Sequence, residues 1–194
     1  MNRALVVIDV QESFRRLPEW ELVSEPNIVG QVNRLVSSAR AHSELVIWVL
    51  GSRPGSGTVF DPALGHVRLM EGLFPHPDEP LITKTAHNAF TTTNLHQMLT
   101  RRGIRELTVC GIRTEQCCET TTRVASDLGF DVTFAVDATA TTPIPHRDAP
   151  AGQTLPQLRD DPRTLGVAEI IERTEYALAG RFAAIRTVDE LTGE

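Results

Sequence analysis

Short apolar runs alternate along this chain with longer segments in which apolar residues recur at helical spacing. The runs at residues 4–8 and 45–50 show no alternation of apolar and polar positions, which is typical of strands buried on both faces of a sheet. Shorter apolar runs predict four further strands. These four lie at residues 81–83, 107–110, 132–136 and 182–185.

The segments between the runs predict helices at residues 24–39, 93–103, 115–128 and 164–179, and a last helical turn at 188–191. Thr93 can cap the second of these helices, and Gly129 follows the third. Two other segments, residues 51–80 and 141–162, are rich in Pro with Gly or with charged residues, and they predict long loops. A loop as long as 51–80 within a compact domain is often functional.

This order of strands and helices predicts the α/β class. We expect one three-layer domain over residues 1–194, in which a six-stranded, mostly parallel sheet carries helices on both faces. The sequence contains no internal repeat and no linker that would divide it. In such Rossmann-like folds the ligand lies beyond the carboxyl ends of the strands, so residues that follow the strands are the first candidates for chemistry.

Charge and cysteine content exclude several functional classes. A net charge of −6 without clustered Lys and Arg disfavours binding to nucleic acid. No apolar run is long enough for a signal peptide or a membrane span, so we expect no membrane partner. The three cysteines, Cys110, Cys117 and Cys118, form no CxxC or CxxH spacing, which predicts neither a zinc site nor a disulfide framework. We therefore expect a cytoplasmic protein in a reducing compartment.

Three side chains with complementary chemistry follow strands of the predicted sheet. Asp9 follows the first strand and Lys84 the third, while Cys117 comes after the fourth, early in the expected helix 115–128. A helix N-terminus and a nearby ammonium both favour a thiolate, so we expect Lys84 to lower the pKa of Cys117. Asp9 could accept the thiol proton and return it to a leaving group, while backbone N–H groups could hold an oxyanion. These are the groups that acyl transfer requires.

Each of these residues also has a structural explanation. A lone cysteine early in a helix is usually a packing residue, and a lysine after a strand is more often solvated at the surface. Adjacent Cys117 and Cys118 would suit a redox protein, but the CxxC motif is missing. Asp9 would suit a Mg²⁺-dependent phosphatase, but the second aspartate of such a protein would fall at Gln11. A catalytically silent binding module is a further alternative.

Three motifs at separate strand ends resemble those of the isochorismatase-like cysteine hydrolases, a family that includes nicotinamidases and N-carbamoylsarcosine amidases. Residues 5–14, LVVIDVQESF, resemble the opening strand with its catalytic Asp, and residues 84–90, KTAHNAF, resemble the lysine motif. Residues 111–117, GIRTEQC, resemble the nucleophile motif Gly-x-x-Thr-x-x-Cys. The resemblance runs from residue 4 to about residue 140, with the motifs in the right order.

The resemblance implies a catalytic triad of Asp9, Lys84 and Cys117. Cys117 would attack a carbonyl and form a thioester, Asp9 would move the proton, and Lys84 would orient Asp9. In the family the peptide bond that corresponds to Ile112–Arg113 is cis, which makes the backbone N–H groups of Arg113 and Cys117 the expected oxyanion donors. The family also implies a homo-oligomer, either a dimer or a tetramer.

Expectations about metal and substrate follow from the places where the chain departs from the family. The Asp-x-His metal motif of nicotinamidases is replaced by residues 51–55, GSRPG, so we expect no metal and no other cofactor, and nicotinamidase activity is disfavoured. Gln11, Phe14 and Phe90 are the candidate substrate-binding residues, with Arg53 as a fourth. Both phenylalanines could instead belong to the core.

These features predict hydrolysis of a C–N bond in a small amide, carbamoyl or ureido substrate. Retention of the cysteine favours amide chemistry, because some relatives that hydrolyse the vinyl ether of isochorismate lack it. Hydrolysis of such a non-amide bond is the alternative, beside the silent binding module. Arg113 stands where many relatives carry a small residue, and it could narrow the pocket, bind an anionic substrate or face solvent.

Overall fold

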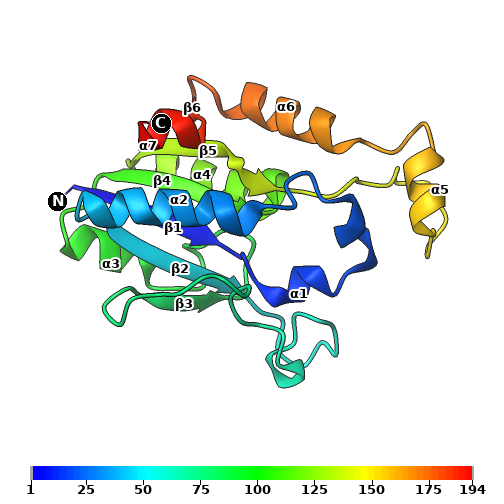
Figure 1. The fold of residues 1–194 in the computed structure, drawn as a ribbon, viewed down its shortest axis with the longest axis horizontal. Coiled ribbons are helices and arrows are strands. Elements are labelled where there is room, and N and C mark those ends of the chain that lie inside the picture. Colours follow the sequence, from blue (N-terminus) through cyan, green and yellow to red (C-terminus); the bar gives the residue numbers. More distant parts are fainter. Residues whose placement is uncertain (1, 194) are drawn as a thin grey trace.

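Six strands form one sheet in the order β3-β2-β1-β4-β5-β6, and all of the neighbouring pairs are parallel (Figure 1). The computed structural model describes residues 2–193. The strands are β1 (Arg3–Ile8), β2 (Leu45–Gly51), β3 (Leu81–Lys84), β4 (Glu106–Ile112), β5 (Asp131–Ala140) and β6 (Ala184–Arg186). The expected α/β class and its six strands are confirmed, and the sheet is wholly rather than mostly parallel.

The helices are α1 (Glu12–Arg15), α2 (Ile28–Ala41), α3 (Leu95–Arg101), α4 (Glu119–Asp127), α5 (Leu155–Asp160), α6 (Val167–Leu178) and α7 (Val188–Thr192). Two 3₁₀ turns, η1 (Pro18–Leu22) and η2 (Pro62–Leu64), and a π-helical segment, η3 (Thr114–Cys118), complete the described elements. All the expected helices are present. Helices α1 and α5 were not expected, because each is too short to show a helical period. Within residues 2–193 no helix is both long and apolar enough to cross a bilayer.

Alternate side chains of β1 enter two separate cores, one on each face of the sheet. On one face Val6 packs in a core with residues of α3, α4 and α6. On the other face Val7 packs in a core with residues of α2 and α7 and with Phe14 of α1. Both valines are fully buried, and each such side chain contributes about 1.5–3 kcal/mol to stability. Because helices cover both faces, the strand sequences show no alternation.

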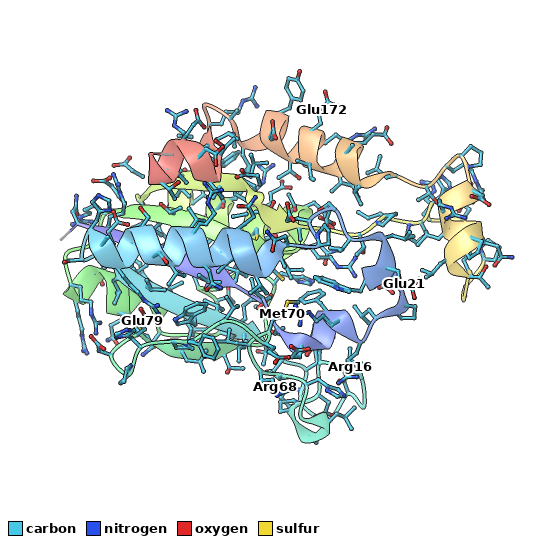
Figure 2. The ribbon with its side chains drawn as sticks, viewed as in Figure 1. Arg16, Glu21, Arg68, Met70, Glu79 and Glu172 are labelled. Carbon is cyan, nitrogen blue, oxygen red and sulfur yellow. The ribbon has the colours of Figure 1, made fainter. Side chains whose placement is uncertain are left out.

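The segment that was expected to be a long loop, residues 51–80, returns alongside α1. Leu69 forms an antiparallel bridge with Gln11, and the Met70 N–H donates to the Val10 carbonyl oxygen at 3.0 Å. Figure 2 shows Met70 close to α1. These contacts hold the segment near the carboxyl ends of β1 and β2, which is where ligands bind in folds of this class.

The other expected loop, residues 141–162, begins an extension that carries α5 away from the sheet (Figure 1). Ile144 and Leu165 join its two limbs by an antiparallel bridge, with mutual backbone hydrogen bonds of 3.1 and 2.9 Å. At α5, Thr154 caps the helix in a reciprocal arrangement with Gln157. The extension is therefore ordered by local hydrogen bonds rather than by the two cores.

Candidate active site

Asp9 follows β1 in a backbone conformation that residues with side chains seldom adopt. Its φ is 53°, in the left-handed region, which costs on the order of 1–2 kcal/mol for a residue with a Cβ. The Asp9 N–H is fixed by donation to the Val49 carbonyl oxygen of β2 at 2.8 Å. A Cβ on Gly51 would lie 3.2 Å from both Asp9 carboxylate oxygens, so glycine at the end of β2 leaves room for this buried carboxylate.

Lys84, the last residue of β3, contacts both other members of the expected triad. Its ammonium lies 2.7 Å from Asp9 Oδ2 and donates to Cys117 Sγ at 3.3 Å. It also donates to the Ala86 carbonyl oxygen at 3.1 Å. These three partners match the three protons of an ammonium group. The fold therefore brings Asp9, Lys84 and Cys117 together at the carboxyl edge of the sheet, with Lys84 between the other two.

Cys117 is half-buried and lies in η3, which links β4 to α4. The peptide bond between Ile112 and Arg113, just before this segment, is cis. Gly111 has a φ of 127°, and a Cβ at this position would collide with the carbonyl oxygen of Ile8. Only glycine therefore permits the close approach of β4 and β1 at the point where the Cys117 segment begins.

Two buried threonines anchor this segment to β5. The Thr114 hydroxyl lies 2.9 Å from the Thr139 hydroxyl, which in turn donates to the Val136 carbonyl oxygen at 2.7 Å. Both threonine side chains are almost fully buried. Because buried hydroxyl groups are costly without partners, this chain of hydrogen bonds fixes η3, and with it Cys117, relative to the sheet.

Burial determines the protonation of the three side chains. It raises the pKa of Cys117 to about 12, and the Asp9 carboxylate adds to that shift while the Lys84 ammonium opposes it. Lys84 therefore lowers the pKa of Cys117 as expected, but burial outweighs this effect, so the net shift is upward and favours the thiol at neutral pH. Burial also raises the pKa of Asp9, against the effect of Lys84. Burial alone would lower the pKa of Lys84, but Asp9 and Cys117 raise it, so the ammonium stays charged.

The second carboxylate oxygen of Asp9, Oδ1, is buried and has no hydrogen-bond partner within residues 2–193. A buried acceptor without a donor costs about 1–3 kcal/mol, so such atoms usually have a reason. Here the raised pKa of Asp9 and the free lone pairs of Oδ1 make the carboxylate a suitable proton acceptor.

A cavity of about 310 Å³ opens over these side chains. Asp9, Lys84 and Cys117 all line it. Phe14, Leu17 and Phe60 supply apolar wall, and the Phe14 and Phe60 rings meet edge to face with centroids 5.1 Å apart. The polar wall includes the side chains of Arg53, His87 and Arg113 together with uncharged residues such as Gln116. The size suits a small molecule, since ligand pockets span about 300–1,000 Å³.

Of the four candidate substrate-binding residues, Phe14 and Arg53 line the cavity, whereas Gln11 and Phe90 do not. Gln11 is fully buried and binds the backbone of Gly51 twice, accepting from its N–H at 2.7 Å and donating to its carbonyl oxygen at 3.0 Å. Phe90 lies in the core and stacks on Phe130, with centroids 6.1 Å apart. Both residues are therefore packed beneath the cavity wall and do not contact the cavity itself.

Arg113 is held against the apolar wall. It forms an ion pair of 3.1 Å with Glu19, and its guanidinium carbon lies 5.8 Å from the centroid of the Phe14 ring. Its side chain is only 14% exposed. Of the three roles open to it, narrowing of the pocket agrees with this position, and facing solvent does not.

Several cavity residues were not identified from the sequence. Leu17 lies at the start of η1 and Phe60 lies in an irregular segment. Glu19, which pairs with the lining residue Arg113, lies within η1. Neither kind of segment has a hydrophobic period, so no signal in the chain distinguished these residues from other loop residues.

Comparison with known proteins identifies a family. The Isochorismatase domain matches residues 3–154. The isochorismatase family protein YrdC of Bacillus subtilis is 28% identical over 194 residues, which cover 100% of this chain and 96% of YrdC. Nicotinamidase 3 of Arabidopsis thaliana is 33% identical over 150 residues, which cover 71% of this chain and 73% of that protein.

The solved structures agree with the sequence comparison. A hydrolase of the isochorismatase family from Chromobacterium violaceum has the same fold, with a TM-score of 0.86 over 99% of this chain and 92% of its own, at 22% identity. The domain match alone covers well over half of the sequence. This chain therefore belongs to the isochorismatase family of hydrolases.

Proposed function

We propose that this hydrolase cleaves a C–N bond of a small amide, carbamoyl or ureido compound through a thioester on Cys117. The observation that carries the proposal is the position of the Lys84 ammonium, 2.7 Å from Asp9 Oδ2 and 3.3 Å from Cys117 Sγ, at the base of the cavity. A thiol, a carboxylate and a cation in mutual reach are the groups that nucleophilic acyl transfer requires.

In the first half-reaction the Cys117 sulfur attacks the carbonyl carbon of the substrate while its proton passes to Asp9. Because the pKa of Cys117 is raised to about 12, attack and proton transfer must be coupled, and the raised pKa of Asp9 makes it a better base. The backbone N–H groups of Arg113 and Cys117 hold the developing oxyanion. Asp9 then protonates the leaving nitrogen, the C–N bond breaks, and a thioester is left on Cys117.

In the second half-reaction Asp9 takes a proton from water, and the oxygen of that water attacks the thioester. The C–S bond breaks, the acid product leaves, and the proton on Asp9 returns to the Cys117 sulfur. Lys84 keeps its charge through both half-reactions and offsets the negative charge that moves between Asp9 and Cys117.

The name of the plant relative, nicotinamidase, supports C–N chemistry for this chain as well. The metal motif of nicotinamidases is replaced here by residues 51–55. In addition, no three His, Cys, Asp or Glu side chains of residues 2–193 lie together so that they could hold a metal ion. We therefore assign no step of the reaction to a metal.

Ammonia release from a panel of linear primary amides and ureido compounds tests the proposal. We expect the wild-type protein to release ammonia, and Cys117→Ala to lose at least about 10³-fold in rate, as expected when a nucleophile is removed. Cys118→Ala is the matched control, because Cys118 is adjacent in sequence but buried in the core. Near-wild-type release by Cys117→Ala would remove Cys117 from the mechanism.

The same assay separates the competing functions. Hydrolysis of a vinyl ether releases no ammonia, and a silent binding module turns over neither class of compound. Cleavage of a vinyl ether together with inertness toward every amide would replace the proposed reaction by the alternative one.

A further inference from the structure

The charges that line the cavity do not cancel. Asp9 is the only acidic residue among the described lining residues, and Lys84 already neutralises it at 2.7 Å. Arg53 and Arg113 add two permanent positive charges, and His87 can add another when protonated. The chain as a whole carries a net charge of −6, so this excess of positive charge is local to the cavity.

Arg113 does not contribute to this excess of positive charge, because the Glu19 carboxylate compensates the charge of its guanidinium. Their ion pair of 3.1 Å and the position of Arg113 over the Phe14 ring hold this guanidinium in a fixed place within the wall. A substrate anion that bound Arg113 would have to compete with the Glu19 carboxylate.

Arg53 differs from Arg113 in that no carboxylate of the described part of the chain compensates its charge. No Asp or Glu of residues 2–193 forms an ion pair with its side chain, which is exposed at the cavity and lies with its guanidinium carbon 5.9 Å from the centroid of the Phe60 ring. Its backbone is nevertheless fixed, because the Arg53 N–H donates to the Phe60 carbonyl oxygen at 2.8 Å and the Arg53 carbonyl oxygen accepts from the Ser56 N–H at 3.2 Å.

A guanidinium over an aromatic ring keeps its edge free for two parallel hydrogen bonds, the geometry that suits a carboxylate. We propose that the substrate carries a carboxylate at the end away from its scissile bond, and that Arg53 binds this carboxylate. The inference rests on the proposed function in one respect, namely that the molecule held by Arg53 is the one cleaved at Cys117. It makes Arg53 a specificity-determining residue.

The ligands for the test are three matched pairs of small amides. Malonamate, succinamate and glutaramate each carry a primary amide and a carboxylate, and they differ by one methylene in length. Malonamide, succinamide and glutaramide replace that carboxylate by a second, neutral amide. Binding is measured by titration calorimetry on Cys117→Ala protein, which lacks the nucleophile and so cannot consume the ligand through the proposed thioester.

We expect at least one of the three carboxylates to bind at least tenfold more tightly than its diamide. Addition of Arg53→Gln to the Cys117→Ala protein should weaken binding of that carboxylate about 10-fold to 100-fold, the loss typical of a hydrogen bond to a charged group, and should leave the diamide within about twofold. Arg53→Lys keeps the charge but loses the two parallel N–H donors of the guanidinium, so its affinity for the carboxylate should lie between those of the protein that retains Arg53 and the Arg53→Gln protein. Arg68→Gln is the control, because Arg68 is exposed in the same segment and does not line the cavity (Figure 2).

Three outcomes would overturn the inference. The two members of every pair could bind with equal affinity, the preference for the carboxylate could persist in Arg53→Gln, or none of the three carboxylates could bind. The ammonia assay on the wild-type protein tests the proposed reaction independently of the binding measurements on Arg53. If the carboxylate preference depends on Arg53 but no amide is cleaved, the anion site stands and the proposed reaction fails. If amides are cleaved without such a preference, the reaction stands and the anion site fails.

Discussion

The Lys84 ammonium lies 2.7 Å from Asp9 Oδ2, in an ion pair whose two side chains are each 3% exposed. Both groups have lost their hydration, and their mutual attraction only about offsets that loss. Removal of one partner is different, because it leaves the other charge buried without compensation. The pair therefore contributes little net stability and yet is costly to break.

The first prediction concerns this ion pair. Lys84→Met should lower the free energy of unfolding at pH 7 by about 3–5 kcal/mol, because it leaves the Asp9 carboxylate buried alone. Urea denaturation followed by circular dichroism measures the change. The double variant Asp9→Asn with Lys84→Met should recover most of the loss, since it removes the uncompensated charge. A loss below about 1 kcal/mol for Lys84→Met would show that Asp9 is reached by water or takes up a proton once the ammonium is removed.

The second prediction concerns the pH dependence of Cys117. Its pKa is raised to about 12, so the thiolate fraction increases with pH throughout the range below that value. The rate of alkylation by iodoacetamide should therefore rise about tenfold per pH unit from pH 7 to 10, without a plateau near pH 9. Mass spectrometry of the labelled peptides should find Cys117 modified before Cys110 and Cys118, which are both fully buried.

Asp9→Asn provides the control for this prediction. The Asp9 carboxylate contributes to the raised pKa of Cys117, so its removal should lower that pKa and speed alkylation at pH 8. The same variant should lose ammonia release, because it lacks the base. If the alkylation rate of the wild type reached a plateau at neutral pH, Cys117 would already be a thiolate there. Labelling of Cys118 before Cys117 would contradict the assignment of the nucleophile.

The third prediction separates a steric requirement at Gly111 from a conformational one. Gly129→Ala places a side chain at a φ of 86° with no atom within 4 Å of the new Cβ, and should cost about 1–2 kcal/mol. Gly111→Ala adds a collision with the Ile8 carbonyl oxygen at the base of the Cys117 segment. We expect Gly111→Ala to lower the free energy of unfolding, measured by thermal denaturation, clearly more than Gly129→Ala does. We also expect it to abolish ammonia release. Equal losses in the two variants would mean that β4 can shift away from β1.

The architecture could be predicted from the sequence because it follows from local patterns. Continuous apolar runs identified the strands, and helical spacing identified α2, α3, α4, α6 and α7. Helix α5 escaped prediction because its signal is a single capping box, formed by Thr154 and Gln157, in a segment rich in proline and charge. Short elements of this kind depend on contacts that no period in the sequence reveals.

The carboxyl edge of the sheet shows where prediction of the site succeeded and where it stopped. Asp9 and Lys84 were placed together because parallel strands end at the same edge. Gln11 and Phe90, taken from the same motifs, turned out to lie behind the cavity wall. The motifs give the position of these residues along the chain, but the direction of each side chain depends on the packing around it.

The sequence by itself determined the order of the elements, the parallel sheet and the meeting of Asp9, Lys84 and Cys117, because these follow from short-range patterns and from the geometry of parallel strands. Only the tertiary structure decided that burial raises the pKa of Cys117, that Glu19 neutralises Arg113 and that no carboxylate of residues 2–193 pairs with Arg53. The physical reason is that a pKa or an ion pair depends on burial and on neighbours brought in by η1 and residues 51–80. Those segments carry no hydrophobic period that could place them in advance.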